Sequence, residues 1–268
     1  MKGSVFAATL PEGRNQAELD ERSRLIVQAV QQGLFLPLTW HEVAAGPHAF
    51  MVLEDALRIG EPDDYLRVNV TAIDQQQIAD VLGVSLLTAK MNDLAYRAAK
   101  VLLEPCMQPD SVKNGTMAHT TAMVRHSREV DAKLAGRTGL TATVCKTWVL
   151  SNKPKPGYAA NHGWHTQKAR PSGQKDGGPY PCEGGGWIWQ NLGTHHTVGH
   201  VDYSQGADYA YPWVRVVEEA GTRYLPIEVV LRDAVLAKHF SYEGPLEDTR
   251  QPEAAVLPTL YPTWGMCF

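Results

Sequence analysis

The chain has 268 residues, of which 44% are hydrophobic and 20% charged, as in soluble globular proteins with a substantial core. Its formal net charge of −4 gives no general attraction to nucleic acid or to an anionic membrane. Its apolar runs are far shorter than a membrane span, and the first residues lack the apolar core of a signal peptide. We therefore expect no nucleic-acid or membrane partner, and a protein that is cytoplasmic, or phage-borne and released without a classical signal.

The first half of the chain alternates between helix and strand patterns. Asn15 can cap a helix over residues 16–32, which Gly33 would end. Strand-like runs follow over 34–40, 48–60 and 64–71. Thr71 can cap a second helix over 72–83, and apolar periodicity predicts a third over 87–103 and a fourth over 120–136. The segment 104–115 breaks the pattern with two prolines and a glycine.

The second half is rich in strand and loop signals. Strands are predicted over 140–150, 186–192, 200–206, 213–220 and 223–233, and a proline-rich tail follows. The fold class is therefore predicted as α+β, with a mixed helix/strand N-terminal half and a mostly β, loop-rich C-terminal half. We expect one domain, 1–268, organised as a helix/strand lobe (1–137), a β-rich lobe that carries the site (138–244) and a tail (245–268).

The segment 76–96 is the one candidate for DNA binding. Ala79 and Gly83 fit a helix-turn-helix register, but that register places Asn92 at a core position. Few basic residues accompany it, and affinity for DNA rests largely on phosphate neutralisation. An ordinary packed helix pair is the better interpretation.

The four cysteines, Cys106, Cys145, Cys182 and Cys267, are widely spaced and form no C-x-x-C pair. This spacing argues against a zinc ribbon or a disulfide-dense scaffold, and we expect free thiols. Cys145 is a conceivable nucleophile, but its place in an apolar strand favours a buried structural thiol.

Half of the ten histidines fall between residues 162 and 200. If 196–204 is a strand, one face carries His196, His200, Asp202 and Ser204, and the other carries His195 and Tyr203. One interpretation is a zinc site formed from His162, His165, His196 and His200. Another is metal-free chemistry, in which a carboxylate orients a histidine that transfers protons. A third is that these are polar loops and satisfied core histidines.

Aromatic residues gather in the same region of the sequence. Trp164, Trp187 and Trp189 precede the last histidines, and exposed aromatic faces stack on sugar rings. The alternative is that the tryptophans belong to the core.

The motifs "NHGWH" (161–165) and "HTVGHVDYSQG" (196–206) resemble those of a group of uncharacterised bacterial proteins that carry Y-G-W-H and H-x5-D-Y-S-H-G. The similarity covers about residues 60–206 and brings no known activity. It favours His165 and His196 over the other histidines of the region. Cys145 and Gln205 stand where the group has histidine. The positions that it marks are Asp64, Lys90, Asp93, His126, Lys146, His165, His196, Asp202, Tyr203 and Ser204.

The combined pattern favours a hydrolase that acts on a polar polymer such as peptidoglycan, a peptide or a glycan, without a cofactor. His165 and His196 would transfer protons, Asp202 would orient one of them, Ser204 or Tyr203 would be nucleophile or acid, and Lys146 would stabilise negative charge. Substrate binding is assigned to Trp164, Trp187, Trp189, His126 and Asp64. The alternative function is a non-enzymatic glycan-binding protein or a phage or particle assembly protein.

Overall fold

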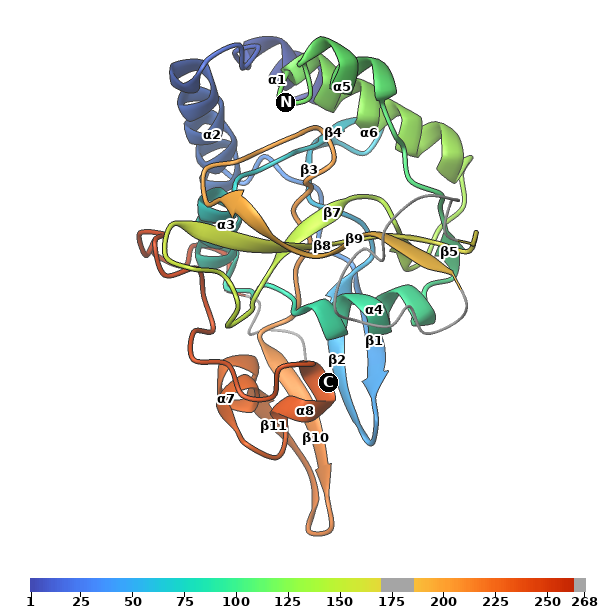
Figure 1. The fold of residues 1–268 in the computed structure, drawn as a ribbon, viewed down its shortest axis with the longest axis vertical. Coiled ribbons are helices and arrows are strands. Elements are labelled where there is room, and N and C mark those ends of the chain that lie inside the picture. The colour runs from blue at the N-terminus through green and yellow to red at the C-terminus, as the bar shows by residue number, and fades with distance from the viewer. Residues whose placement is uncertain (170–185, 263–268) are drawn as a thin grey trace.

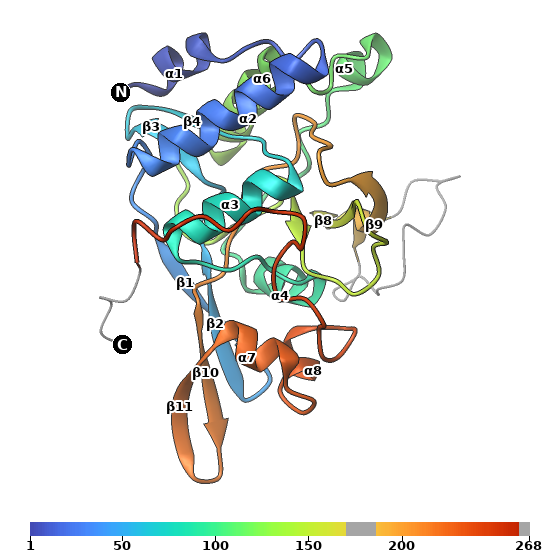
Figure 2. The same ribbon diagram turned by 90° about the vertical axis from the view of Figure 1, so that its left-hand side faces the viewer.

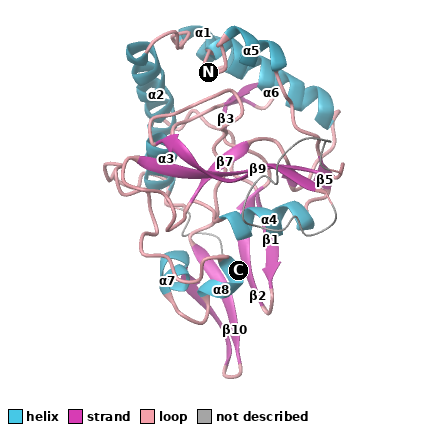
Figure 3. Ribbon diagram, viewed as in Figure 1, coloured by secondary structure: helices cyan, strands magenta, loops and turns pink. Residues whose placement is uncertain are grey.

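The computed structural model describes residues 1–169 and 186–262 and has an α+β fold, with strands concentrated in the C-terminal half (Figures 1 and 3). The helices are α1 (Gly3–Thr9), α2 (Gln16–Gln31), α3 (Ala72–Leu82), α4 (Ala89–Ala98), α5 (Pro109–Asn114), α6 (Thr120–Leu134), α7 (Ile227–Arg232) and α8 (Ala237–Phe240). The strands are β1 (Trp40–Ala45), β2 (His48–Leu53), β3 (Arg58–Glu61), β4 (Asp64–Arg67), β5 (Val101–Leu102), β6 (Thr141–Ala142), β7 (Lys146–Val149), β8 (Tyr158–Thr166), β9 (Trp187–Thr197), β10 (Trp213–Glu218) and β11 (Gly221–Pro226).

The strands form two larger sheets and two short pairs. The order β1-β2-β10-β11 makes a four-stranded antiparallel sheet, and β7-β8-β9 makes a three-stranded antiparallel one. The pair β3-β4 is antiparallel, and the two-residue pair β5-β6 is parallel. Because β2 pairs with β10, the segments before and after residue 138 share a sheet.

Helices α2 and α3 form where their sequence signals place them. The side chain of Asn15 accepts the Glu18 N–H at 3.0 Å and begins α2. Thr71 begins α3 through a capping box with Asp74, and Gly83 ends that helix in the left-handed region with φ 63°. These caps satisfy backbone groups that a helix end leaves unpaired.

Two helix predictions differ from the structure. The helix expected over 87–103 is limited to α4, because Thr88 caps its start and the backbone beyond Ala98 turns to pair with Leu140 and β6. The segment 104–115, expected to be irregular, contains α5 with Pro109 in its first turn.

Three strand predictions also differ. In the run 34–40, Phe35 forms an isolated bridge to Ile59, and the regular strand β1 starts only at the last residue, Trp40. The strand expected over 223–233 ends at Pro226, after which Ile227, Val230 and Leu231 bury one side of α7 at helical spacing. The segment 200–206 is a turn beyond the end of β9 and not a strand.

The three-stranded sheet lies between α6 and α4 (Figure 1). Its β8 strand contacts α4, and Trp148 of β7 is fully buried with its indole N–H donated to the Val70 carbonyl at 2.8 Å. The tail after residue 245 runs across α3, where Leu260 and Tyr261 donate their N–H groups to the Val81 carbonyl (Figure 2). Among the described residues, no helix has the length and apolar character needed to span a bilayer.

Candidate functional site

The two faces of the β7-β8-β9 sheet carry two separate polar clusters. Toward α4, His162 and His165 meet Asp93. Toward α6, Lys146 meets Asp202 and Trp164. We call the first group the Asp93 cluster. The Asp202 cluster is the second group without Trp164 and with three further residues, His196, His200 and Ser204.

The Asp93 cluster is built around one buried carboxylate. His162 Nε2 and His165 Nε2 lie 2.7 and 2.6 Å from Asp93 Oδ1, and Tyr242 donates its hydroxyl to Oδ2 at 2.7 Å. The ring of His165 stacks on Tyr96 at 4.4 Å. Burial alone would raise the pKa of Asp93, but the two histidines hold it well below its usual range.

The geometry of β8 explains why His162 and His165 share a face although they are three residues apart. Side chains alternate along a regular strand, so this spacing would place them on opposite sides. Gly163 and Trp164 between them have φ of 128° and 61°, and the pairing with β9 shifts register there. The irregularity turns both imidazoles toward α4.

The Asp93 cluster is also the place where a metal ion could bind. Asp93, His162 and His165 each offer a ligand atom, and these atoms lie within 4.8 Å of one another. The four histidines of the predicted zinc set are divided, because His196 and His200 lie with Asp202 instead.

The Asp202 cluster joins five of the residues singled out in the sequence: Lys146, His196, His200, Asp202 and Ser204. Lys146 Nζ lies 3.0 Å from Asp202 Oδ2, and the two side chains are only 9% and 4% exposed. His200 Nε2 lies 3.9 Å from the same oxygen. Burial would raise the pKa of Asp202, but the Lys146 ammonium and the contacts with His200 and Ser204 hold it well below its usual range.

His196 and His200 form the accessible part of the cluster. Their rings stack in parallel with centroids 4.1 Å apart, and both meet the buried Trp148 edge to face. The side chain of His200 is 36% exposed. Partial burial, and then the neighbouring His200, lower the pKa of His196, so this ring is neutral at neutral pH.

Ser204 and Tyr203 are held in supporting hydrogen bonds. The Ser204 N–H donates to Asp202 Oδ1 at 2.7 Å, and its hydroxyl donates to the same atom. The Tyr203 hydroxyl accepts the Gln108 N–H at 2.9 Å. Ser204 therefore fixes the position of Asp202, and Gln108 fixes that of Tyr203. Among the residues that the structure describes, neither the Ser204 nor the Tyr203 hydroxyl forms a hydrogen bond with a histidine.

A buried aromatic layer lies behind the Lys146–Asp202 pair. The Lys146 ammonium sits 5.3 Å from the ring centroid of Trp164, which packs with Tyr203 and Ala122. His126 of α6 lies beside both rings, 6.4 Å from Trp164 and 5.6 Å from Tyr203. Burial lowers the pKa of His126 to about 3, so its imidazole is neutral.

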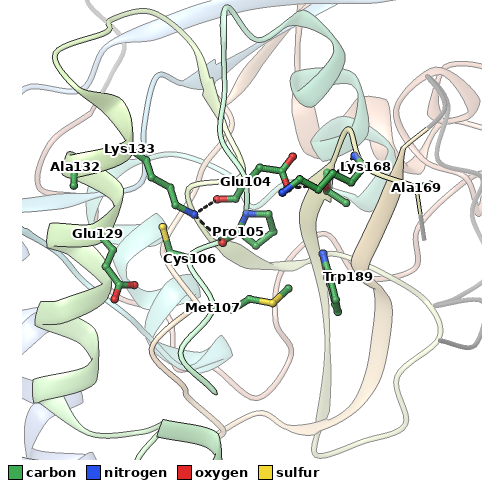
Figure 4. Close-up of a pocket in the computed structure, with 11 residues that line it drawn as sticks. Glu104, Pro105, Cys106, Met107, Glu129, Ala132, Lys133, Lys168, Ala169 and Trp189 are labelled. Atoms are coloured by element: carbon green, nitrogen blue, oxygen red, sulfur yellow. Dashed lines mark hydrogen bonds and ion pairs between the residues drawn. The ribbon is translucent and has the colours of Figure 1, made fainter. Parts of the chain in front are cut away.

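An open groove of about 590 Å³ lies next to this layer (Figure 4). Trp189 forms one wall and packs against Trp164 and Tyr203 on its inner side. Met107, Glu129 and Lys133 are among the other residues that line the groove. Trp187 contacts Trp189 at the start of β9, with ring centroids 4.4 Å apart.

His165 and Asp64, both predicted site residues, lie outside the Asp202 cluster and the aromatic layer behind it. His165 belongs to the Asp93 cluster on the other face of the sheet. Asp64 binds the N–H and hydroxyl of Ser4 in the first turn of α1. Cys182 and Cys267 lie outside the described residues, whereas Cys106 and Cys145 are free thiols.

Two sets of contacts were not predicted from the sequence. These are the contacts of His165 with Asp93 and Tyr96, and the packing of His196 and His200 on Trp148. Asp93 and Tyr96 of α4 reach His165 from about 70 residues away, and Tyr242 reaches Asp93 from 149 residues away, so no local signal predicts these contacts. Trp148 reads as an ordinary strand residue in the sequence. Comparisons with protein-family models, with curated proteins and with solved structures gave no match to this chain.

Proposed function

We propose that the protein is a hydrolase of a polar polymer, and that the stacked pair His196–His200 carries its acid–base chemistry. Two imidazoles whose ring centroids lie 4.1 Å apart do not readily carry a positive charge at the same time, because like charges repel. Asp202 Oδ2 lies 3.9 Å from His200 Nε2, so this ring has a carboxylate beside it. Environments that separate the proton affinities of two neighbouring groups are typical of acid–base sites.

In this proposal neutral His196 accepts a proton from water as the water oxygen attacks the scissile carbon. His200 donates its proton to the departing nitrogen or oxygen as that bond breaks. Asp202 stabilises the His200 imidazolium, and Ser204 fixes Asp202 in place. Lys146 neutralises the buried carboxylate. The sequence pattern assigned one of the two proton-transfer roles to His165. We assign that role to His200 instead, because His165 is bonded to Asp93 and stacked on Tyr96.

The test is hydrolysis of dye-labelled peptidoglycan, labelled casein and a labelled acidic polysaccharide by the full chain. His196→Ala and His200→Ala should each lower the rate by about 100-fold or more, the usual contribution of a general acid or base. His195→Ala is the matched control, because this exposed histidine lies on the same strand next to His196. Unchanged turnover in both test variants would rule out the assignment.

The second candidate is a glycan-binding or particle-assembly protein, and the groove at Trp189 favours it. An indole wall flanked by charged residues suits a sugar chain without any need for catalysis. If the wild-type chain hydrolyses none of the three substrates but retains the polysaccharide on a column, and Trp189→Ala abolishes that retention, the binding function replaces the hydrolase.

A further inference from the structure

Three buried side chains next to the Lys146–Asp202 pair carry nitrogen atoms without a hydrogen-bond partner among the residues that the structure describes. These atoms are Trp164 Nε1, Gln205 Nε2 and His126 Nε2. The residues are 7%, 0% and 2% exposed. The indole and amide nitrogens can only donate, and a neutral imidazole nitrogen donates in one of its two tautomers.

Two of these residues contact the ion pair directly, and the third lies beside one of them. Trp164 lies under the Lys146 ammonium, and His126 lies beside Trp164. Gln205 accepts the Asp202 N–H through its side-chain oxygen at 2.9 Å, which holds its amide next to Asp202. The ion pair therefore has unpaired donors beside it on Trp164 and Gln205, and that of His126 lies on the neighbour of Trp164.

Asp202 does not satisfy these donors. Its Oδ1 already accepts two hydrogen bonds from Ser204, and its Oδ2 accepts one from Lys146. Buried donors are almost always paired, since leaving one unpaired costs folding free energy. A cluster of donors around an ammonium group calls for an acceptor that carries negative charge.

We propose that Lys146, Trp164, Gln205 and His126 bind a carboxylate group of the substrate. A carboxylate is small and presents two acceptor oxygens to this donor set. The assignment rests on the proposed function and deepens it: the polymer would bear carboxylates, as acidic glycans and peptide ends do. The bound carboxylate would hold the substrate polymer beside His200. The partly exposed side chain of His200 faces Asp202, the partner of Lys146.

The test is thermal unfolding of the full chain in rising concentrations of sodium acetate, with sodium chloride at equal ionic strength as reference and sodium phosphate as a second arm. Acetate should raise the Tm along a saturable curve, since a ligand that binds only the folded state stabilises it. Trp164→Phe should weaken the apparent acetate affinity by about tenfold, which is the effect of losing one hydrogen bond to a charged group. Gln205→Glu should weaken it by more than that, because this change also adds a negative charge that repels acetate.

Trp40→Phe is the matched control. Trp40 also has a buried, unpartnered indole nitrogen, but it lies on β1 against Tyr211 and away from Lys146. This variant should keep the wild-type acetate response.

Equal effects of acetate and chloride on the wild-type protein would overturn the proposal, even if a variant fails to fold. A wild-type response in Trp164→Phe and Gln205→Glu would overturn it as well, and a stronger response to phosphate than to acetate would overturn the carboxylate assignment. Because no turnover is measured, loss of the hydrolase assignment would leave a positive acetate response intact. A missing response would likewise leave the His196 and His200 results standing.

Discussion

At the scale of single residues, two carboxylates organise the polar interior of this protein in different ways. Asp93 of α4 is bonded by two imidazoles and a phenol hydroxyl, and it is buried where α4 contacts β8. Asp202 forms an ion pair with Lys146 and faces His200, whose side chain is partly exposed. Only the second arrangement combines a stabilised charge with solvent access, which is why we place the chemistry there.

The Asp93 cluster allows a prediction about metal content. The Leu192 N–H donates to His162 Nδ1 at 3.1 Å, so the proton of this neutral ring sits on Nε2, the atom that a metal would need. A metal would have to displace that proton and this backbone hydrogen bond. We therefore expect wild-type protein dialysed against zinc to retain no stoichiometric zinc at this cluster, as measured by elemental analysis. Stoichiometric zinc that is lost in His165→Ala would contradict this inference.

At the scale of elements, helix caps decide where the scaffold of the site begins. In α3 the Thr71 hydroxyl accepts the Asp74 N–H at 3.1 Å, and the Asp74 carboxylate accepts the Thr71 N–H at 3.2 Å. The same helix carries Gln75, whose amide donates to the hydroxyl of Thr147 on β7. The cap therefore helps to fix the sheet that carries Lys146.

Thr71→Ala should lower the free energy of unfolding by about 1 kcal/mol, the usual cost of a lost N-cap. Thr71→Ser keeps the hydroxyl and should retain most of the stability. Urea denaturation of the three proteins measures the difference. A loss in Thr71→Ser as large as in Thr71→Ala would show that the cap hydrogen bond is not the cause.

At the scale of the whole molecule, buried ionisable groups set the dependence of stability on pH. The pKa of His126 is lowered by burial to about 3, so between pH 6.5 and 3 the unfolded chain binds a proton that the folded protein refuses. This term makes stability fall as pH falls through that window. Burial raises the pKa of Asp208 to about 7, so between pH 7 and 4 the folded protein binds a proton that the unfolded chain does not. Asp208 therefore makes stability rise as pH falls through that window.

His126→Gln separates the two effects. In urea denaturation at pH 7, 6, 5 and 4, the wild-type protein should lose up to about 1.4 kcal/mol per pH unit relative to this variant below pH 6. His195→Gln, at an exposed position, should follow the wild-type curve. Parallel curves for wild type and His126→Gln would show that His126 is protonated in the folded state.

Much of the helical scaffold could be predicted from the sequence because its signals are local. Asn15, Thr71 and Gly83 act on backbone groups within a few residues, and their caps are present in the structure. The α+β class followed from the same patterns and is confirmed. The extent of α4 was not predictable, since its end is set by pairing with residues near 140, far along the chain.

The sequence by itself grouped His196, His200, Asp202 and Ser204, but it did so by assuming one strand over 196–204. In the structure β9 ends at Thr197, and a turn follows. They gather because the turn after β9 folds back on Lys146. Only the tertiary structure decided that His165 lies apart from them. The positive φ angles at Gly163 and Trp164 turn it toward Asp93, which the fold brings from α4 to the opposite face of the sheet.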